Sequence, residues 1–319
     1  MKLGVAPSGR RSAADAVRLA RLAEDAGLAE VWVSEDYLER GAFAVAGAMA
    51  AVTSSVTIGL GVINPWTRHV ALTAMEAHAL DEIANGRSVV GIGASNAGWM
   101  HGRLGIPFER PIGRLAEYTD ALRILLAGET LTSTVGGQQV NASLDAHPPR
   151  SIPIIWGVKG PRALELASAH ADGLMLSVLS SPGYERWVQD TYAPQQVTSY
   201  ASFAVDATAT VAREKLRPLV TRFLGMHGSS AITEHAGIDQ ALAADLRERF
   251  LTNQPGQHLV DDAIVASVTV SGTPDDCAQA LLAHRDAGVD SLVVIDDGST
   301  DPDAVVAGLV DAASRAELL

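Results

Sequence analysis

The chain has 319 residues, a length that fits either two average domains or one α/β barrel, because such barrels use roughly 250 residues as a single unit. Hydrophobic residues make up 47% of the chain and charged residues 19%, so a core can form and disorder is excluded as the main state. The formal net charge of -13 disfavours nucleic acid and anionic membranes as partners, because like charges repel.

Cysteine usage and the N-terminal segment predict a cytoplasmic protein. Cys277 has no second cysteine to form an intramolecular disulfide or a multi-thiolate metal site, and a small buried side chain is its expected role. Residues 1–10 lack the basic, apolar and small-residue pattern of an export signal. No apolar run reaches the roughly 18 residues of a membrane span, so no membrane contact is expected.

Strand and helix patterns alternate along the first part of the chain. Ser12 predicts an N-cap, and Gly27 a stop, for a helix that ends at Ala26. Hydrophobic patterns predict further helices at 43–52, 71–84 and 111–128, and strands at 3–6, 31–34, 56–63 and 88–93.

The second part continues the alternation, with two less regular regions. Residues 131–150 predict an irregular segment or a hairpin around Gly136-Gly137. Residues 206–274 are mainly helical in pattern and longer than one connection needs, so an insertion is expected there. The remaining strands are predicted at 154–157, 174–178, 200–205 and 291–295, and the remaining helices at 163–169, 274–287 and 304–315.

This order predicts the fold class α/β, as a (β/α)8 TIM barrel with a helical insertion before the last strand. Near-continuous apolar strands are typical of a parallel sheet covered by helices. A doubly wound open sheet is the alternative. Without a Pro-, Gly- or Ser-rich linker, residues 1–319 are expected to form one domain. In a barrel the functional groups follow the carboxyl ends of the strands.

Several familiar motifs are incomplete. Gly59-Leu60-Gly61 and Gly91-Ile92-Gly93 lack the third glycine of a dinucleotide-binding fingerprint. Residues 93–97 resemble a nucleophile elbow, but Ala97 replaces the second glycine. The carboxylate pairs at 35–36 and 296–297 leave a glycosidase open, although only 5% of the chain is aromatic. The nine histidines have no metal-ligand spacing, and no metal is predicted.

Three segments at strand ends point to ligand binding. Residues 157–162 put cations and free backbone N–H groups at a helix start, which suits an anion but is also an ordinary Gly-Pro helix start. The glycines at 59–61 indicate either a flat ligand against the strand or a bend in the barrel. Residues 32–40 carry acidic, phenolic and guanidinium groups for proton transfer, or form a salt-bridged loop.

Taken together, these segments resemble the luciferase-like monooxygenase superfamily and, within it, the deazaflavin-dependent branch that includes methylenetetrahydromethanopterin reductase. The similar stretches are 31–43, 58–69, 80–96, 157–173 and 287–290. The resemblance implies a TIM barrel with coenzyme F420, or alternatively FMN, across the strand ends, and a non-proline cis peptide at Gly61–Val62. It also implies a homodimer or larger assembly.

Matching to the superfamily assigns candidate residues. The cofactor-binding candidates are Gly61, Val62, Asn64, Gly93, Ser95, Asn96, Gly157, Lys159, Gly160, Arg162 and Ser177. The substrate-binding candidates are Tyr37, Arg40, Trp66, Arg68, His69 and Trp99. Arginines at 10, 11 and 40 are candidates for the anionic tail of F420.

Two departures from the superfamily concern the proton donor. Relatives often carry Asp-His after strand two, where this chain has Glu35-Asp36, and some carry a glutamate after strand four, where it has Asn96. We therefore hypothesise that Asp36, with Glu35, takes the acid/base role. The expected activity is hydride transfer between C5 of F420 and a small organic substrate. An FMN-dependent monooxygenase and a non-catalytic flavin- or deazaflavin-binding protein are the alternatives.

Overall fold

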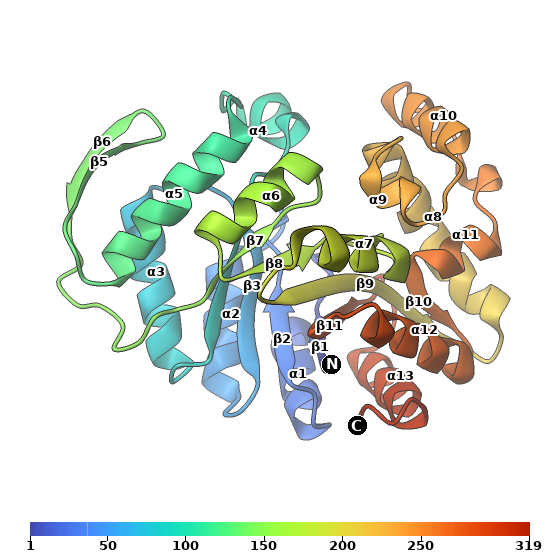
Figure 1. Ribbon diagram of the computed structural model, residues 1–319. Coiled ribbons are helices and arrows are strands. Elements are labelled where there is room, and N and C mark those ends of the chain that lie inside the picture. Colours follow the sequence, from blue (N-terminus) through green and yellow to red (C-terminus); the bar gives the residue numbers. More distant parts are fainter. Residues whose placement is uncertain (37) are drawn as a thin grey trace.

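The computed structural model describes residues 1–36 and 38–319 and shows a barrel with helices around it (Figure 1). In this part of the chain eight parallel strands close on themselves through a pairing of β8 with β9. The barrel strands are β1 (Lys2–Ala6), β2 (Glu30–Val33), β3 (Thr57–Ile63), β4 (Ser88–Gly93), β7 (Ile154–Gly157), β8 (Gly173–Leu176), β9 (Val197–Val205) and β11 (Ser291–Ile295). The predicted fold class is confirmed.

The helices predicted from hydrophobic periodicity follow the strands around the barrel. They are α1 (Ala13–Asp25), α2 (Ala42–Val52), α3 (Val70–Ile83), α5 (Pro111–Leu126), α6 (Pro161–His170), α12 (Pro274–Asp286) and α13 (Pro302–Arg315). The predicted cap at Ser12 is present, since its side chain accepts a hydrogen bond from the backbone N–H of Asp15. None of the helices in the described ranges has the length and apolar character of a bilayer-spanning segment.

Residues 206–274 are less uniformly helical than predicted. They contain α8 (Ala209–His227), α9 (Ala231–Glu234), α10 (Gln240–Leu251), a 3-10 turn (Gln257–Leu259) and α11 (Asp262–Ser267). They also contain a strand, β10 (Thr269–Gly272), which pairs with the last residues of β9. The start of β9 pairs instead with β11, so β9 carries two different neighbours along one side.

Two helices were not predicted from the sequence, whereas the expected hairpin is present. The two helices are α4 (Ala97–Leu104) and α7 (Pro182–Tyr192), which lie in stretches without a predicted element. Their helix starts are marked by Asn96 and Ser181, whose side chains accept hydrogen bonds from backbone N–H groups three residues later. The hairpin expected around Gly136-Gly137 is present as β5 (Leu131–Val135) and β6 (Gln138–Ala142).

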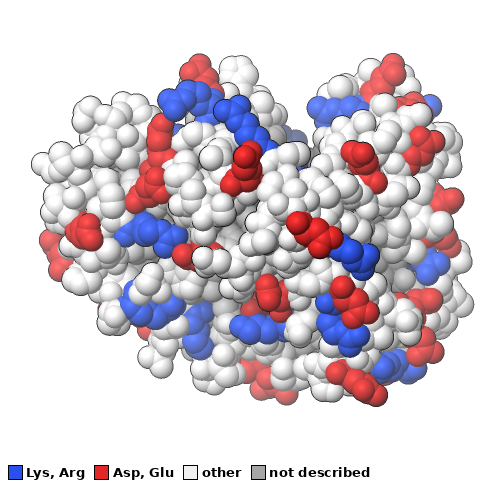
Figure 2. All heavy atoms as spheres, viewed as in Figure 1, with Lys and Arg blue, Asp and Glu red and all other residues white. Residues whose placement is uncertain are grey.

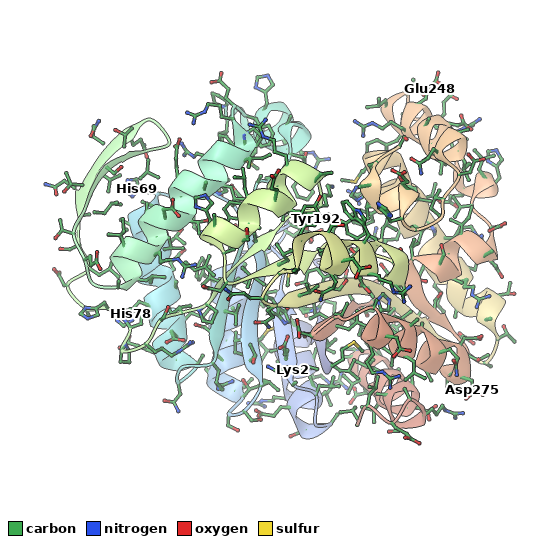
Figure 3. The ribbon with its side chains drawn as sticks, viewed as in Figure 1. Lys2, His69, His78, Tyr192, Glu248 and Asp275 are labelled. Atoms are coloured by element: carbon green, nitrogen blue, oxygen red, sulfur yellow. The ribbon has the colours of Figure 1, made fainter. Side chains whose placement is uncertain are left out.

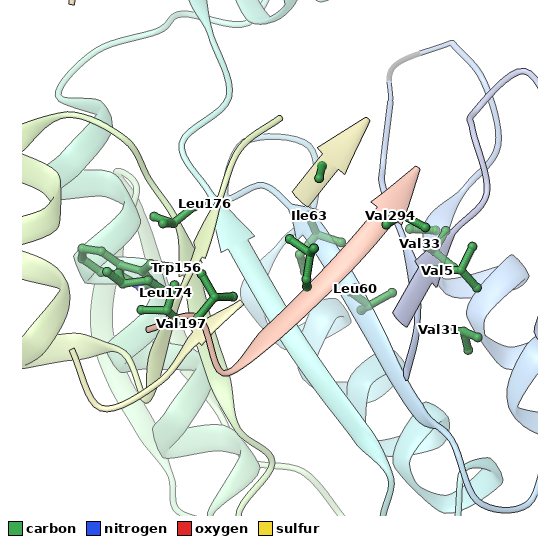
Figure 4. Close-up of a cluster of buried hydrophobic side chains, with 14 of the residues drawn as sticks. Val5, Val31, Val33, Leu60, Ile63, Trp156, Leu174, Leu176, Val197 and Val294 are labelled. Carbon is green, nitrogen blue, oxygen red and sulfur yellow. The ribbon is translucent and has the colours of Figure 1, made fainter. Parts of the chain in front are cut away.

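The main core lies between the barrel and its helices. Figure 4 shows side chains of the barrel strands in this layer, among them Val5, Val31, Leu60, Leu174 and Val294. These side chains are almost fully buried, which makes this layer the main source of hydrophobic stabilisation. Cys277 on α12 is buried there as predicted, and burial raises the pKa of its thiol to about 12.

A second, smaller core fills the barrel interior. Trp32, Met175, Tyr200 and Val293 are buried inside it. Near the amino-terminal end, the carboxylate of Glu30 accepts hydrogen bonds from the indole N–H of Trp32 and the hydroxyl of Ser291. Lys2, labelled in Figure 3, lies 3.7 Å from the same carboxylate. This end is closed by paired polar groups, so an interior cavity opens toward the carboxyl ends of the strands.

Candidate functional site

An open cavity of about 210 Å³ lies at the carboxyl ends of the barrel strands. Figure 2 shows the viewed face hollowed at its upper edge, between the lobe that carries α4 to α6 and the lobe that carries α8 to α10. The sequence-predicted residues that line the cavity are Glu35, Asp36, Gly61, Val62, Asn64, Gly93, Ser95, Trp99 and Ser177. Their side chains come from the ends of β2, β3, β4 and β8, as expected for a barrel enzyme.

Several glycines of β3, β4 and β7 lie where a neighbouring side chain occupies the space that a Cβ would need. A Cβ at Gly59 would lie 2.1 Å from the ring of Trp32. A Cβ at Gly93 or Gly157 would lie 2.6 or 2.7 Å from a methyl carbon of Val62. Of the two interpretations of Gly59, a ligand or the barrel itself, the structure therefore supports the barrel, because the indole of Trp32 fills that space.

Gly61 and Val62 form the part of the cavity floor that β3 contributes. The peptide bond between them is cis, as the resemblance implied. The hydroxyl of Ser34 donates a 2.9 Å hydrogen bond to the carbonyl oxygen of Gly61, which fixes the peptide plane from the side of β2. The side chain of Val62 lies against Gly93 and Gly157, so the floor is apolar where the three strands meet.

The two carboxylates after β2 have different environments. Glu35 is ion-paired with the guanidinium of Arg68, which is also 3.1 Å from a carboxylate oxygen of Glu76. The backbone carbonyl of Asp36 accepts a 3.2 Å hydrogen bond from the N–H of Glu39, but the described residues provide no hydrogen-bond or ion-pair partner for its side-chain carboxyl. Burial raises the pKa of Asp36, the nearby charge of Glu39 raises it further, and the charge of Arg222 opposes both. Asp36 is therefore the better candidate for a proton donor.

The segment after β4 combines a strained residue with a helix cap. Ser95 has a φ of 61°, in the left-handed region, and its buried hydroxyl has no hydrogen-bond partner among the described residues. The side chain of Asn96 accepts a 3.0 Å hydrogen bond from the backbone N–H of Trp99. Asn96 thus starts α4 and positions Trp99 at the cavity wall, whereas Ser95 offers a hydroxyl to a ligand.

The residues after β3 mainly hold this loop in place. The side-chain oxygen of Asn64 accepts from the backbone N–H groups of Trp66 and Thr67. The indole N–H of Trp66 donates 2.9 Å to the carbonyl of Ala94. The ring of His69 caps α3 at the end labelled in Figure 3. Trp66 and His69 therefore lie behind the cavity wall, outside the set of residues that line it.

The loop after β7 also lies outside the cavity lining. Gly160 starts α6 without a side-chain cap, and Arg162 is exposed. The side chain of Lys159 is exposed to solvent, but many protein atoms lie around its ammonium group. The resulting desolvation and the charge of Arg247 lower the pKa of Lys159 to about 8. His227 in turn has its pKa lowered to about 3 by burial and by the charges of Lys159 and Arg247. The loop is therefore electropositive.

A shallower hollow adjoins the cavity and shares Glu35 and Asp36 with it. Its lining includes Arg40 and Arg68. Arg40 donates a 2.6 Å hydrogen bond to the carbonyl of Gly9 and remains exposed. Tyr37, a predicted substrate contact, lies outside the described residues.

Arg11 does not fit the expectation that its loop meets an anionic tail. Its guanidinium is buried and ion-paired with the carboxylate of Asp296, and it also donates to the carbonyl of Thr300. Arg10, its neighbour, is exposed. Arg11 therefore ties the end of β1 to the end of β11 and is not free to bind a ligand.

Six described residues of the cavity wall are absent from the predicted set: Ser34, Ile63, Val178, Tyr200, Phe223 and Ile295. Tyr200 on β9 and Phe223 on α8 both line the cavity. A strand predicted to begin at Tyr200 places this residue at the amino end, away from the site. In the structure β9 begins at Val197, and Tyr200 lies farther along the strand. For Phe223 the sequence held no signal, since its position depends on how α8 folds back over the barrel.

Comparisons with known proteins agree with this geometry. A family model described as luciferase-like monooxygenase matches residues 1–291. The 5,10-methylenetetrahydromethanopterin reductase of Methanolobus tindarius is 30% identical over 287 residues, which cover 86% of this chain and 87% of that protein.

Two solved structures share the fold. The coenzyme F420-dependent tetrahydromethanopterin reductase from Methanopyrus kandleri superposes with a TM-score of 0.81 at 23% identity, covering 96% of this chain and 97% of that one. The oxygenating constituent of 3,6-diketocamphane monooxygenase from Pseudomonas putida, solved with FMN, has a TM-score of 0.70 at 18% identity, covering 99% and 97%. The chain belongs to the luciferase-like monooxygenase family.

Proposed function

We propose that the protein is an F420-dependent oxidoreductase that transfers a hydride between C5 of the deazaflavin and a small organic substrate. The observation that carries the proposal is the cavity at the carboxyl ends of the strands, in a chain whose 30% identical relative is a 5,10-methylenetetrahydromethanopterin reductase. The similar structure from Methanopyrus kandleri is described as coenzyme F420-dependent.

The residues present fit such a ligand. The apolar floor around Val62 suits one face of a flat ring, and the unpaired hydroxyl of Ser95 suits a polar edge. Ser177 and the electropositive loop around Lys159 and Gly160 suit the phosphate. When bound, the deazaflavin would supply the hydride-transferring carbon.

The chain's own contribution is orientation, exclusion of water and control of one proton. Trp99 on α4 and Phe223 on α8 line the cavity with aromatic rings, which leave less room for water beside the substrate. Arg68 is held by Glu35 and gives the rim a fixed positive group that can orient a polar substrate. Asp36, whose pKa is raised by burial, holds a proton at its carboxyl oxygen for transfer to or from the substrate.

An FMN-dependent monooxygenase is the second candidate, favoured by the shared fold of the FMN-bound structure from Pseudomonas putida. Binding separates the two. We expect fluorescence titration of the purified chain to give a dissociation constant for F420 at least tenfold below that for FMN, about 1.4 kcal/mol of preference. Tight FMN binding with no measurable F420 binding would instead support the monooxygenase.

We also infer that the protein self-associates through the outer face of α3. Leu72, Met75 and Ile83 share this face and are 54%, 56% and 51% exposed. Large apolar side chains exposed together on one helix are typical of an interface. Light scattering should give twice the chain mass for the wild type and the monomer mass for Met75→Glu; a monomeric wild type would contradict the inference.

A further inference from the structure

Tyr200 has an unusual position for a buried tyrosine. It is 6% exposed, packs inside the barrel beside Trp32 and Met175, and lines the cavity. Its hydroxyl has no hydrogen-bond partner among the described residues. A Cβ at Gly61 would lie 2.4 Å from the hydroxyl oxygen, so the oxygen is in close contact with the strand that forms the floor. A buried hydroxyl without a partner is suited to bind a ligand atom.

The hydroxyl of Tyr200 keeps its proton. Burial raises the pKa of Tyr200, and the negative charges of Asp36 and Glu30 raise it further. The nearby hydroxyl of Ser34 opposes this and is the largest influence after burial. No hydrogen bond of normal geometry joins the two hydroxyls, however, and Ser34 donates to the carbonyl of Gly61. Tyr200 is therefore a neutral donor with its hydrogen free.

The cavity contains a second group that can donate an O–H, the carboxyl of Asp36 in its protonated form. Asp36 lines the same cavity from the end of β2. Burial, together with the charge of Glu39, favours the protonated carboxyl, although Arg222 opposes this. Glu35, the neighbouring carboxylate, is engaged by Arg68 and does not compete for this role. A buried tyrosine and a protonated aspartate together form a known type of oxyanion-stabilising pair, for which the general precedent is ketosteroid isomerase.

Two neutral donors discriminate between classes of hydride acceptor. Addition of hydride to a C=O carbon moves the π-electron pair onto oxygen, which then needs hydrogen-bond donors and one proton. Addition to an iminium carbon leaves a neutral amine, which needs neither. Hydrogen-bond donors fixed where negative charge develops therefore stabilise the transition state of carbonyl reduction but not that of iminium reduction.

We propose that Tyr200 and Asp36 together bind the oxygen of a carbonyl substrate, so that the protein reduces ketones or aldehydes, or oxidises the corresponding alcohols. The inference rests on the proposed F420-dependent activity. In the reductive direction, hydride leaves the reduced deazaflavin for the carbonyl carbon, and the carbonyl π pair moves to oxygen. Asp36 gives its proton to that oxygen, Tyr200 donates a hydrogen bond and keeps its proton, and solvent reprotonates Asp36. The deazaflavin ends two electrons more oxidised.

The test uses Tyr200→Phe, which removes the hydroxyl and keeps the ring. Tyr192→Phe is the matched control, because Tyr192 lies at the end of α7 away from the cavity lining (Figure 3). F420 binding is titrated first by fluorescence. Reduction by reduced F420 is then followed with cyclohexanone and with protonated 1-pyrroline, an iminium. We expect wild type to reduce cyclohexanone in preference to the iminium, and Tyr200→Phe to lower kcat for cyclohexanone about 100-fold with little change in KM.

An infrared measurement makes the test independent of turnover. The C=O stretch of cyclohexanone, assigned with a carbonyl-13C sample, is recorded with the enzyme holding oxidised F420. We expect a band at lower frequency than in free cyclohexanone for wild type and Tyr192→Phe, and a shift back toward the free value in Tyr200→Phe. Melting temperatures of the three proteins should agree, since the hydroxyl makes no internal hydrogen bond.

The outcomes separate the two proposals. If F420 does not bind, the proposed function and this inference both fail. If F420 binds but the C=O band is unshifted in wild type, or equally shifted in Tyr200→Phe, Tyr200 does not bind the carbonyl oxygen and only this inference fails. Preferential reduction of the iminium by wild type would overturn the substrate class in the same way.

Discussion

The packing of the cavity floor leads to a quantitative expectation for Gly93→Ala. A Cβ at this position would lie 2.6 Å from Cγ2 of Val62 and 3.2 Å from the carbonyl oxygen of Gly157. Relaxed carbon contacts are about 3.5–4.0 Å, so the overlap with Val62 is roughly 1 Å. Overpacking of this kind costs about 1–3 kcal/mol, and we expect the free energy of unfolding to fall by that amount. F420 affinity should fall too, because Val62 is pushed into the cavity.

A double-mutant cycle identifies Val62 as the cause. Val62→Ala removes the methyl group that the new Cβ would meet, although the contact with the carbonyl of Gly157 remains. We therefore expect part of the cost of Gly93→Ala to disappear in the double variant, with a coupling energy of about 1–2 kcal/mol. Additive effects of the two substitutions would refute this account of the floor.

Urea unfolding followed by tryptophan fluorescence measures each free energy, and a titration gives the F420 dissociation constant of each variant. Gly102→Ala is the matched control. Gly102 lies inside α4, and a Cβ there would meet nothing within 4 Å. This substitution should leave stability unchanged or raise it by up to about 1 kcal/mol through helix propensity. A loss of stability in the control would show that the method responds to any added methyl group.

Three further expectations concern charged groups. Asp36→Asn should lower kcat about 10²- to 10⁴-fold at unchanged F420 affinity, because the proton donor is removed. In the wild type the donor is the protonated carboxyl, so carbonyl reduction should decline as the pH rises through the raised pKa of Asp36. A rate that rises with pH would contradict the assignment. Lys159 has a pKa of about 8, so F420 binding should weaken as the pH increases through that value, because the ammonium group loses its charge. The weakening should be smaller in Lys159→Met. If wild type and Lys159→Met show the same pH dependence, Lys159 does not bind the phosphate. Arg11→Met leaves Asp296 buried without its partner and should destabilise the fold by about 3–5 kcal/mol in thermal or urea unfolding, whereas a neutral result would argue against the buried pair.

The barrel could be predicted because each strand carries its own signal. Continuous apolar runs and glycine stops mark the strands and helices of the barrel independently of tertiary contacts. The missed elements lack such a signal. β10 is four residues long and exists through its pairing with the end of β9, and α4 lies in a stretch whose two glycines weaken a helix pattern.

The positions of the candidate site along the sequence could be predicted, but the roles of its side chains could be predicted less well. Resemblance located the cis peptide at Gly61–Val62 and the cavity residues after β2, β3 and β4. It could not distinguish Glu35, which is held by Arg68, from Asp36, because that difference arises from a partner 33 residues away. Tyr200 was missed for a related reason, since its hydroxyl meets Gly61 only once the barrel closes.

The most direct test of the account is the crystal structure of the chain with F420 bound. We expect the three fused rings to lie over Val62, within the cavity bounded by Ser95, Ser177 and Tyr200, and the phosphate to lie near Lys159 and Gly160. Rings located outside this cavity, or F420 absent from crystals grown with saturating ligand, would contradict it.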